Sequence, residues 1–272
     1  MIPQIYYRGV PLSYSMVPLP TLALARLIVR NFRQDDFSLI IVDGNLRVGK
    51  SAYAMKAVDQ AHEYIYGKGV KTMSDFKWVM GWDPDDVIDL WMATDDRQPV
   101  FIWDDAGYWL HSMNWNDPLM ISIQRYFNVV GTDFNTIILT TPSPKWVLSK
   151  IANMPEMIRI KCTKRDGSWT FNNEGRKFAR KAKGYKKWDS PDLKRGGVNT
   201  YLEDDYSCKL DQALYDEYLP IRLKYAQEAK LQIVRNLNRQ RQREELEELK
   251  ELKTLKKLRK EMFGDTLKGI VN

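Results

Sequence analysis

The sequence contains few of the residues that build disulfide frameworks and zinc sites. Its 272 residues include only two cysteines and two histidines. Cys162 and Cys208 show neither a pairing motif nor the close Cys and His spacing of a zinc site. We therefore expect no structural zinc, and the low cysteine content indicates a reducing, cytoplasmic environment.

Long apolar runs are also missing. No stretch of about 18 apolar residues occurs, so we expect no membrane-spanning helix. The most apolar early stretch, residues 16–29, is interrupted by Pro18, Pro20 and Arg26, and it has no basic start or cleavage site. We therefore expect no signal peptide. With 44% hydrophobic and 28% charged residues, the composition is typical of one folded domain with room for an appendage.

Basic residues are concentrated in the second half of the chain. The chain has 42 Lys and Arg against 35 Asp and Glu, a net charge of +7. Residues 161–195 contain twelve basic and four acidic residues, and residues 222–261 contain thirteen and seven. The remainder is acidic overall. A positive second half favours a polyanionic partner.

Short apolar runs alternate with helical sequence in the first half. The runs FSLIIV (37–42), VFIW (100–103) and TIIL (136–139) each predict a buried strand, and an amphipathic helix at 51–65 follows the first. Helical sequence between strands implies crossover connections. We therefore expect an α/β fold with a mainly parallel sheet covered on both faces.

The rest of the chain carries weaker signals. Residues 158–163 alternate, a turn is predicted at 165–167, and alternation resumes at 168–171, which predicts a hairpin. The predicted parts are an N-terminal segment packing on the core (1–36), a core ending in this hairpin (37–171), a basic irregular segment (172–210) and a helical tail (211–272).

The leucines of the tail do not follow a heptad pattern. They recur every three residues, whereas a coiled-coil seam alternates steps of three and four. A strict three-residue step rotates the apolar position by about 60° each time, so these leucines spiral around the helix. We expect a long charged helix rather than a two-stranded coiled coil. The residues concerned are Leu246, Leu249, Leu252, Leu255 and Leu258.

The most specific motif lies between the first predicted strand and the first predicted helix. Gly44-Asn-Leu-Arg-Val-Gly49-Lys50-Ser51 matches G-x-x-x-x-G-K-[ST] at every fixed position. The glycines let backbone N–H groups point at phosphate oxygens, and the helix N-terminus adds partial positive charge. Lys50 is expected to reach the β- and γ-phosphates, and Ser51 to bind magnesium. The predicted cofactors are therefore ATP and Mg²⁺. The expected nucleotide contacts are Gly44, Asn45, Leu46, Arg47, Val48, Gly49, Lys50, Ser51 and Ala52.

Two carboxylates follow the second predicted strand, as in a Walker B segment. Asp104 is expected to hold the magnesium ion, directly or through water. Asp105 stands where many such ATPases carry a glutamate that polarises the attacking water, and it is one methylene shorter. The alternative for Asp105 is a capping acid at the start of a helix.

A pair of threonines follows the third predicted strand. A polar side chain at this point, between the two motif strands, would contact the γ-phosphate or the attacking water, and Thr141 is the candidate catalytic residue of the pair Thr140-Thr141. The alternative is a β-branched residue that simply ends a strand before Pro142.

Together these motifs resemble the additional-strand branch of P-loop ATPases, which includes RecA-like, AAA+ and FtsK/HerA-type motors, over residues 37–161. Residues 125–142 look like the FtsK/HerA and zonular-occludens-toxin-like pattern, with Thr-Thr where those families often have Thr-Gln. WDDAGYWL (103–110) with TTPSP (140–144) looks most like the DnaA-like ATPases of archaeal viruses and plasmids.

The resemblance implies a three-layer P-loop NTPase fold, ATP hydrolysis and a homo-oligomer such as a hexameric ring. In such rings an arginine of one subunit reaches the γ-phosphate bound by the next. Arg125 and Arg159 are the candidates by position, with Arg125 preferred as the catalytic residue. The alternative for each is a solvated or salt-bridged surface arginine.

Aromatic residues are interleaved with the cations of residues 161–195. Cations neutralise phosphates and aromatic rings can stack on unpaired bases, so DNA is the expected partner. The alternative is that Trp169 and Phe171 pack on the sheet while the lysines face solvent. The aromatic residues are Trp169, Phe171, Phe178, Tyr185 and Trp188.

Two functions are consistent with these features. The first is an ATPase of a mobile genetic element that couples hydrolysis to replication initiation, DNA packaging or DNA transfer. The second is a nucleotide-dependent assembly scaffold with slow or no hydrolysis. A small-molecule kinase is less favoured because no lid or acceptor pocket is recognisable.

Overall fold

The computed structural model describes residues 5–7, 10–12, 18–155, 157–164, 170–172, 175–177, 179–190 and 195–264. The chain divides into two compact units, residues 1–215 and 216–272. Among the described residues, no helix combines the length and apolar composition needed to cross a bilayer.

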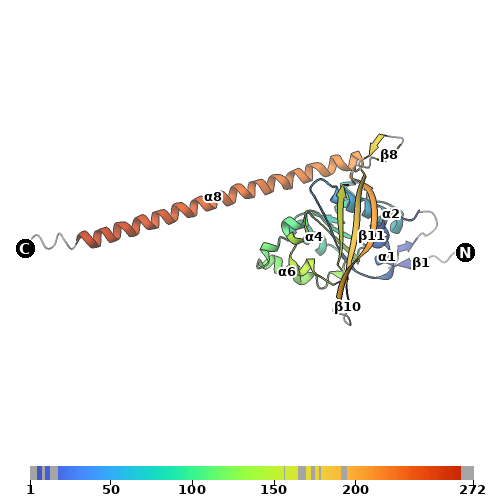
Figure 1. Cartoon of the computed structure of the whole chain (residues 1–272), viewed down its shortest axis with the longest axis horizontal. Coiled ribbons are helices and arrows are strands. Elements are labelled where there is room, and N and C mark those ends of the chain that lie inside the picture. The colour runs from blue at the N-terminus through green and yellow to red at the C-terminus, as the bar shows by residue number, and fades with distance from the viewer. Residues whose placement is uncertain are drawn as a thin grey trace, which may run out of the picture. The chain divides into compact units, whose positions relative to one another are not determined.

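A seven-stranded sheet organises the first unit, with strand order β11-β10-β7-β3-β6-β5-β4 (Figure 1). Strands β4, β5, β6, β3 and β7 run parallel to their neighbours, whereas β10 and β11 extend one edge in antiparallel fashion. A mainly parallel α/β sheet is thereby confirmed. The strands are β3 (Ser38–Gly44), β4 (Met80–Gly81), β5 (Phe101–Trp103), β6 (Thr136–Thr141), β7 (Ile158–Lys164), β10 (Ala179–Ser190) and β11 (Arg195–Ser207).

The remaining elements are helices, short 3₁₀ turns and two small strand pairs. The α-helices are α1 (Ala23–Gln34), α2 (Lys50–Tyr66), α3 (Met73–Phe76), α4 (Pro84–Met92), α5 (Ala106–Trp109), α6 (Pro118–Tyr126), α7 (Ser149–Ala152) and α8 (Gln212–Gly264). The 3₁₀ turns are η1 (Ser112–Asn114), η2 (Val130–Thr132) and η3 (Pro144–Trp146). The strand pairs are β1 (Ile5–Tyr7) with β2 (Val10–Leu12), and β8 (Thr170–Asn172) with β9 (Gly175–Lys177).

Helices cover both faces of the parallel strands. On one face α1 and α2 pack against each other and against β6. On the other face, residues of α4, α5, α6 and α7 join a core cluster that includes Leu39, Trp103 and Ile137. Every residue of β3 and β6 is buried. Continuous apolar strands are required here because both of their faces are covered.

The N-terminal segment contributes α1 to the core. Its apolar side, which includes Leu24 and Ile28, is fully buried. Asn31 on the same helix is also buried, and its Nδ2 atom donates to Oγ1 of Thr136 at 3.1 Å. This hydrogen bond satisfies two polar groups that burial would otherwise leave without partners.

The expected hairpin at 158–171 is wrong. Strand β7 pairs in parallel with β3 and antiparallel with β10, and β8 pairs with β9. Residues 165–169, where the turn was expected, lie outside the described residues. Local alternation identified β7 correctly as a strand, but alternation carries no information about which strand will be its partner.

The segment 172–210 is not irregular as expected. Strands β10 and β11 are 12 and 13 residues long and extend the main sheet. On β10 the inward positions are the buried Ala182 and Gly184, and basic residues alternate with them. Small inward residues weaken the apolar alternation by which a strand is recognised, which is why the sequence suggested irregular structure.

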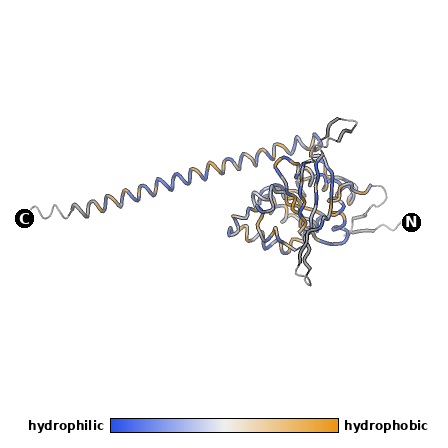
Figure 2. Tube along the Cα trace, viewed as in Figure 1, coloured by the Kyte–Doolittle hydropathy of each residue, from blue (hydrophilic) through white to orange (hydrophobic). Residues whose placement is uncertain are grey.

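The second unit consists of most of α8, which carries Pro220 near its start. The five regularly spaced leucines, Leu246 to Leu258, are each 48–61% exposed. Figure 2 shows this helix as a mainly hydrophilic trace with scattered hydrophobic positions. The structure thus agrees with a long charged helix.

Candidate nucleotide-binding site

The loop of residues 45–49 joins the carboxyl end of β3 to the start of α2, as the motif predicts. Gly49 has φ +83°, a conformation that L side chains rarely adopt. A Cβ atom added there would lie 2.4 Å from Cβ of Cys208. Glycine is therefore required at position 49 for both its conformation and its lack of a side chain.

Lys50, the first residue of α2, lies folded against this loop. It is only 8% exposed. Its Nζ atom donates to the carbonyl oxygens of Gly44 at 3.1 Å and Asn45 at 3.2 Å. These bonds satisfy a nearly buried ammonium and keep its charge within the loop, where an anionic group would be attracted.

Three polar side chains converge at the carboxyl ends of the central strands. Ser51 Oγ and Thr140 Oγ1 each donate to Asp104 Oδ1 at 2.6 Å, and Asp104 is 1% exposed. They meet because β6 lies between β3 and β5, and Ser51 stands at the start of the helix that follows β3. The sequence predicted Ser51 and Asp104 together, and the structure brings them together.

The donor set suits a magnesium ion. Hydroxyl and carboxylate oxygens are the hard ligands that Mg²⁺ prefers, and Mg²⁺ typically uses one or two protein carboxylates together with phosphates and water. Within the described ranges, no group of three or more His, Cys, Asp and Glu residues could hold a metal by itself. One carboxylate with two hydroxyls fits a metal ion that takes further ligands from phosphate and water.

Asp105 is held in a left-handed conformation with φ +49°. It occupies the N-cap position of α5, but its side chain makes no capping hydrogen bond, so the capping alternative does not describe what the carboxylate does. Its backbone N–H donates to Thr140 Oγ1 at 2.8 Å. Such conformations in non-glycine residues cost about 1 kcal/mol or more and are concentrated at functional sites.

The two threonines of β6 point in opposite directions. Thr140 contacts Asp104, whereas Thr141 Oγ1 donates to the carbonyl oxygen of Ser143 at 3.0 Å and accepts from its N–H at 3.3 Å. A Cβ atom on Gly107 would lie 2.1 Å from Thr141 Oγ1, so α5 packs tightly on this hydroxyl. Thr140 is thus the member of the pair that joins Ser51 and Asp104. The pairing of Trp103 with Leu139 sets Thr140 beside Asp104.

The two candidate arginines have different surroundings. Arg125 is exposed in the last turn of α6. Arg159 on β7 forms two bonds with Asp43, from Nε at 2.7 Å and from an Nη atom at 2.9 Å. The Asp43 carboxylate raises the pKa of Arg159. The salt-bridged alternative therefore describes Arg159.

Strand β11 supports the loop from a part of the sequence that we had expected to be irregular. The hydroxyl of Tyr206 donates to the carbonyl oxygen of Val48 at 2.9 Å. Its ring centroid lies 4.7 Å from that of Tyr53, whose hydroxyl donates to Asp204 at 2.6 Å. Burial raises the pKa of Tyr206, and burial followed by the Asp204 charge raises that of Tyr53.

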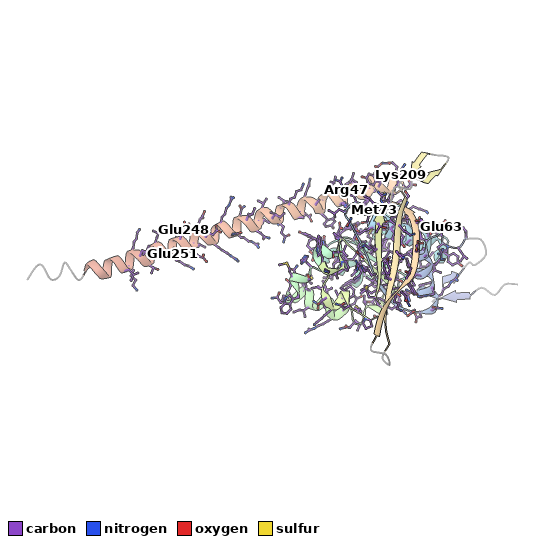
Figure 3. The ribbon with its side chains drawn as sticks, viewed as in Figure 1. Arg47, Glu63, Met73, Lys209, Glu248 and Glu251 are labelled. Carbon is purple, nitrogen blue, oxygen red and sulfur yellow. The ribbon has the colours of Figure 1, made fainter. Side chains whose placement is uncertain are left out.

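The end of β11 also lies at the loop. Lys56 on α2 donates from Nζ to the carbonyl oxygen of Ser207 at 2.7 Å. Figure 3 shows Arg47 of the loop and Lys209, which follows β11, at the same end of the sheet. Sequence reasoning missed this support because nothing local to Tyr206 indicates that it will lie against residue 48.

Sheet order, loop and side-chain cluster together define a P-loop NTPase-like α/β fold. No family model matches the chain. The sequence is 24% identical over 210 residues to an uncharacterized protein, B-251, of Sulfolobus spindle-shape virus 1. The match covers 74% of this chain and 80% of B-251.

A solved structure is also similar in part. It is the genome packaging NTPase B204 of Sulfolobus turreted icosahedral virus 2 in complex with ATP-gammaS. The match has 13% sequence identity and a TM-score of 0.32, and it covers 62% of this chain and 98% of B204.

Proposed function

We propose that this protein binds Mg-ATP at the loop 44–52 and hydrolyses it. The observation that carries the proposal is the convergence of Ser51 and Thr140 on the buried Asp104 carboxylate. Lys50, the residue before Ser51, donates to the carbonyl oxygen of Gly44 in the adjoining loop. Ser51 and Asp104 would hold the metal ion. Bound magnesium would neutralise charge on the phosphates.

The remaining roles follow from position. Lys50 would neutralise the β- and γ-phosphates, and the loop N–H groups would bind their oxygens. Asp105 would orient the attacking water, with a threonine of the Thr140-Thr141 pair beside it. Arg125, exposed on α6, would act on the site of a neighbouring subunit in a homo-oligomeric ring such as a hexamer.

We further propose that hydrolysis serves DNA handling in an archaeal virus or related mobile element. The similarity to B-251 of Sulfolobus spindle-shape virus 1 supports the viral setting. The excess of twelve basic over four acidic residues at 161–195 supports a DNA partner. Replication initiation, DNA packaging and DNA transfer are all consistent with this activity. The low cysteine content favours a cytoplasmic location.

A second candidate is an assembly scaffold in which ATP binding orders a complex with little turnover. Two observations favour it. Asp105 is shorter than the glutamate common in related motors, and α8 is a long helix with exposed leucines that a partner could cover.

Binding and turnover separate these functions. We would measure the affinity for a fluorescent ATP analogue with and without Mg²⁺, and the ATPase rate with and without DNA. Under the hydrolysis proposal, Lys50→Ala and Asp105→Asn each lower turnover by about 100-fold or more, and DNA stimulates the wild type. Lys68→Ala is the matched control, because Lys68 is an exposed lysine just beyond the far end of α2.

The scaffold predicts different results. Assembly would depend on ATP, turnover would stay low with DNA, and Asp105→Asn would behave like the wild type. Absence of saturable nucleotide binding in magnesium buffer would refute both functions.

A further inference from the structure

Basic residues share one face of strands β7 and β10. Register pairs Arg159 with Tyr185, Lys161 with Lys183 and Thr163 with Lys181. Paired residues of adjacent strands point to the same face, and successive residues alternate between faces. These side chains are therefore neighbours on the side of the sheet opposite the buried Ile160, Cys162 and Ala182.

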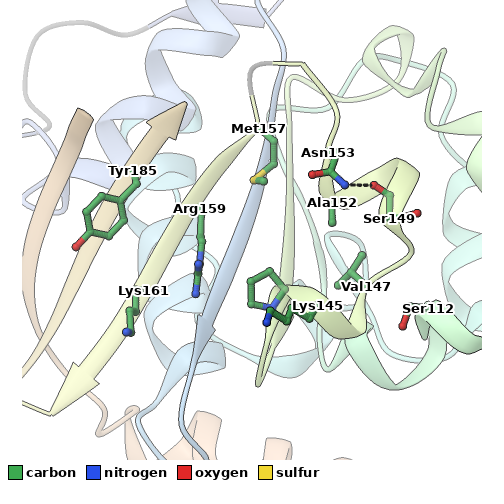
Figure 4. Close-up of a pocket in the computed structure, with 11 residues that line it drawn as sticks. Ser112, Lys145, Val147, Ser149, Ala152, Asn153, Met157, Arg159, Lys161 and Tyr185 are labelled. Atoms are coloured by element: carbon green, nitrogen blue, oxygen red, sulfur yellow. Dashed lines mark hydrogen bonds between the residues drawn. The ribbon is translucent and has the colours of Figure 1, made fainter. Parts of the chain in front are cut away.

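A pocket of about 740 Å³ lies between this face and the segment containing η3 and α7. Figure 4 shows Tyr185, Arg159 and Lys161 on neighbouring strands, with Lys145 and Val147 across the pocket. Ala152 and Met157 add apolar lining. The pocket thus combines an aromatic ring, an apolar wall and a cationic rim.

Two cations of this rim are available for an anion, because Lys145 and Lys161 form no ion pair with a carboxylate of the described residues. Lys183 lies beside the pocket and is paired in register with Glu203 of β11. Lys183 Nζ lies 5.9 Å from the centroid of the Tyr185 ring. Arg159 is oriented by its two bonds to Asp43 and still lines the pocket.

We propose that this pocket binds an unpaired nucleotide of a single-stranded nucleic acid. The base would lie against Tyr185 and the apolar wall, and the phosphates on either side would bind Lys145 and Lys161. A pocket of this volume admits a free base, whereas a base stacked within a duplex cannot enter it. Aromatic stacking with a cationic track is how proteins bind single strands. This site would make the DNA partner of the proposed function a single strand. Single-strand binding rests on the proposed function only for the role that it would serve.

Fluorescence anisotropy of the full chain with a labelled single-stranded oligonucleotide tests the proposal, without nucleotide and over a range of salt. We expect the single strand to bind more tightly than the corresponding duplex. Tyr185→Ala should weaken binding roughly 5- to 100-fold, while Tyr185→Phe, which keeps the ring, should bind like the wild type. Lys161→Ala should weaken binding and lower the slope of log K against log salt by about 0.7.

Lys164→Ala is the matched control, since Lys164 is an exposed lysine of the same strand on the opposite face. It should leave single-strand affinity within about twofold of the wild type. The proposal is overturned by no binding, by equal binding of duplex and single strand, by equal effects of Lys161→Ala and Lys164→Ala, or by a Tyr185→Ala variant that binds normally. Circular dichroism would verify that each variant is folded.

Failure of this proposal is distinguishable from failure of the ATPase proposal. Lys50→Ala should lose ATP binding and keep single-strand binding, because Lys50 contacts the loop and does not line the pocket. Tyr185→Ala should show the reverse pattern. Loss of single-strand binding in Lys50→Ala would contradict the assignment of the two ligands to separate sites.

Discussion

Asp204 connects three segments that are distant in sequence, so its replacement should destabilise the fold. Asp204 is 5% exposed. It accepts from the N–H groups of Ala23 at 2.6 Å and Leu24 at 3.2 Å, and from the hydroxyl of Tyr53 at 2.6 Å. Its charge also lies at the N-terminus of α1, where the helix dipole favours an anion.

The magnitude follows from the groups that lose their partner. In Asp204→Ala, three donors lose their acceptor, and each buried group without a partner costs about 1–3 kcal/mol. Water that enters the vacated space would replace part of the carboxylate. We therefore expect the free energy of unfolding to fall by about 3–4 kcal/mol.

Urea denaturation of the wild type and the variant, followed by circular dichroism, measures this difference. The midpoint should fall while the slope m stays unchanged. Asp205→Ala is the matched control, because Asp205 is the next residue and is exposed. Its loss should cost less than about 1 kcal/mol. If Asp204→Ala were no less stable than Asp205→Ala, the three hydrogen bonds would not hold the segments together as we argue.

Three further predictions concern pH, the loop and the thiols. Burial lowers the pKa of His62 from 6.5 to about 4. Below pH 6.5 the unfolded chain binds a proton at His62 that the folded protein does not bind, so the free energy of unfolding falls by about 1.4 kcal/mol per pH unit as pH falls from 6.5 towards 4. His62→Gln lacks this loss, so the urea midpoints of wild type and variant should converge over this range. Parallel midpoint profiles for the two proteins would contradict the lowered pKa of His62. Gly49→Ala should lose binding of a fluorescent ATP analogue, whereas Gly67→Ala, also at positive φ but with no atom within 4 Å of an added Cβ, should retain it. Burial raises the pKa of Cys162 to about 11, so Ellman's reagent at pH 8 should modify the partly exposed Cys208 much faster, and equal rates would refute the burial of Cys162.

The loop of residues 45–49 between β3 and α2 could be predicted because its determinants are local. A buried strand, two glycines, a lysine and a hydroxyl follow one another within residues 37–51, and backbone conformation alone brings them together. The position of Asp104 beside Ser51 was predictable for a related reason. Polar residues that follow parallel strands meet at the same edge of the sheet.

Pairing between distant strands was less accessible. Residues 158–171 alternate as a hairpin would, yet β7 pairs with β3 and β10. That Thr140, and not Thr141, contacts Asp104 was equally inaccessible, because the face of each threonine depends on the register between β5 and β6. A shift of one residue would exchange the two hydroxyls.

The amino-acid sequence by itself therefore determined the α/β class, the glycine-bounded loop after β3 and the carboxylate that follows β5. The loop depends on residues within one strand–loop–helix segment, and the carboxylate is placed because parallel strands end at the same edge of the sheet. Only the tertiary structure decided that Thr140 contacts Asp104, that Arg159 binds Asp43, and that Tyr206 holds the carbonyl of Val48. Those contacts join residues between 36 and 158 positions apart. Their formation depends on how the strands are ordered and aligned, which the alternation within any one strand does not specify.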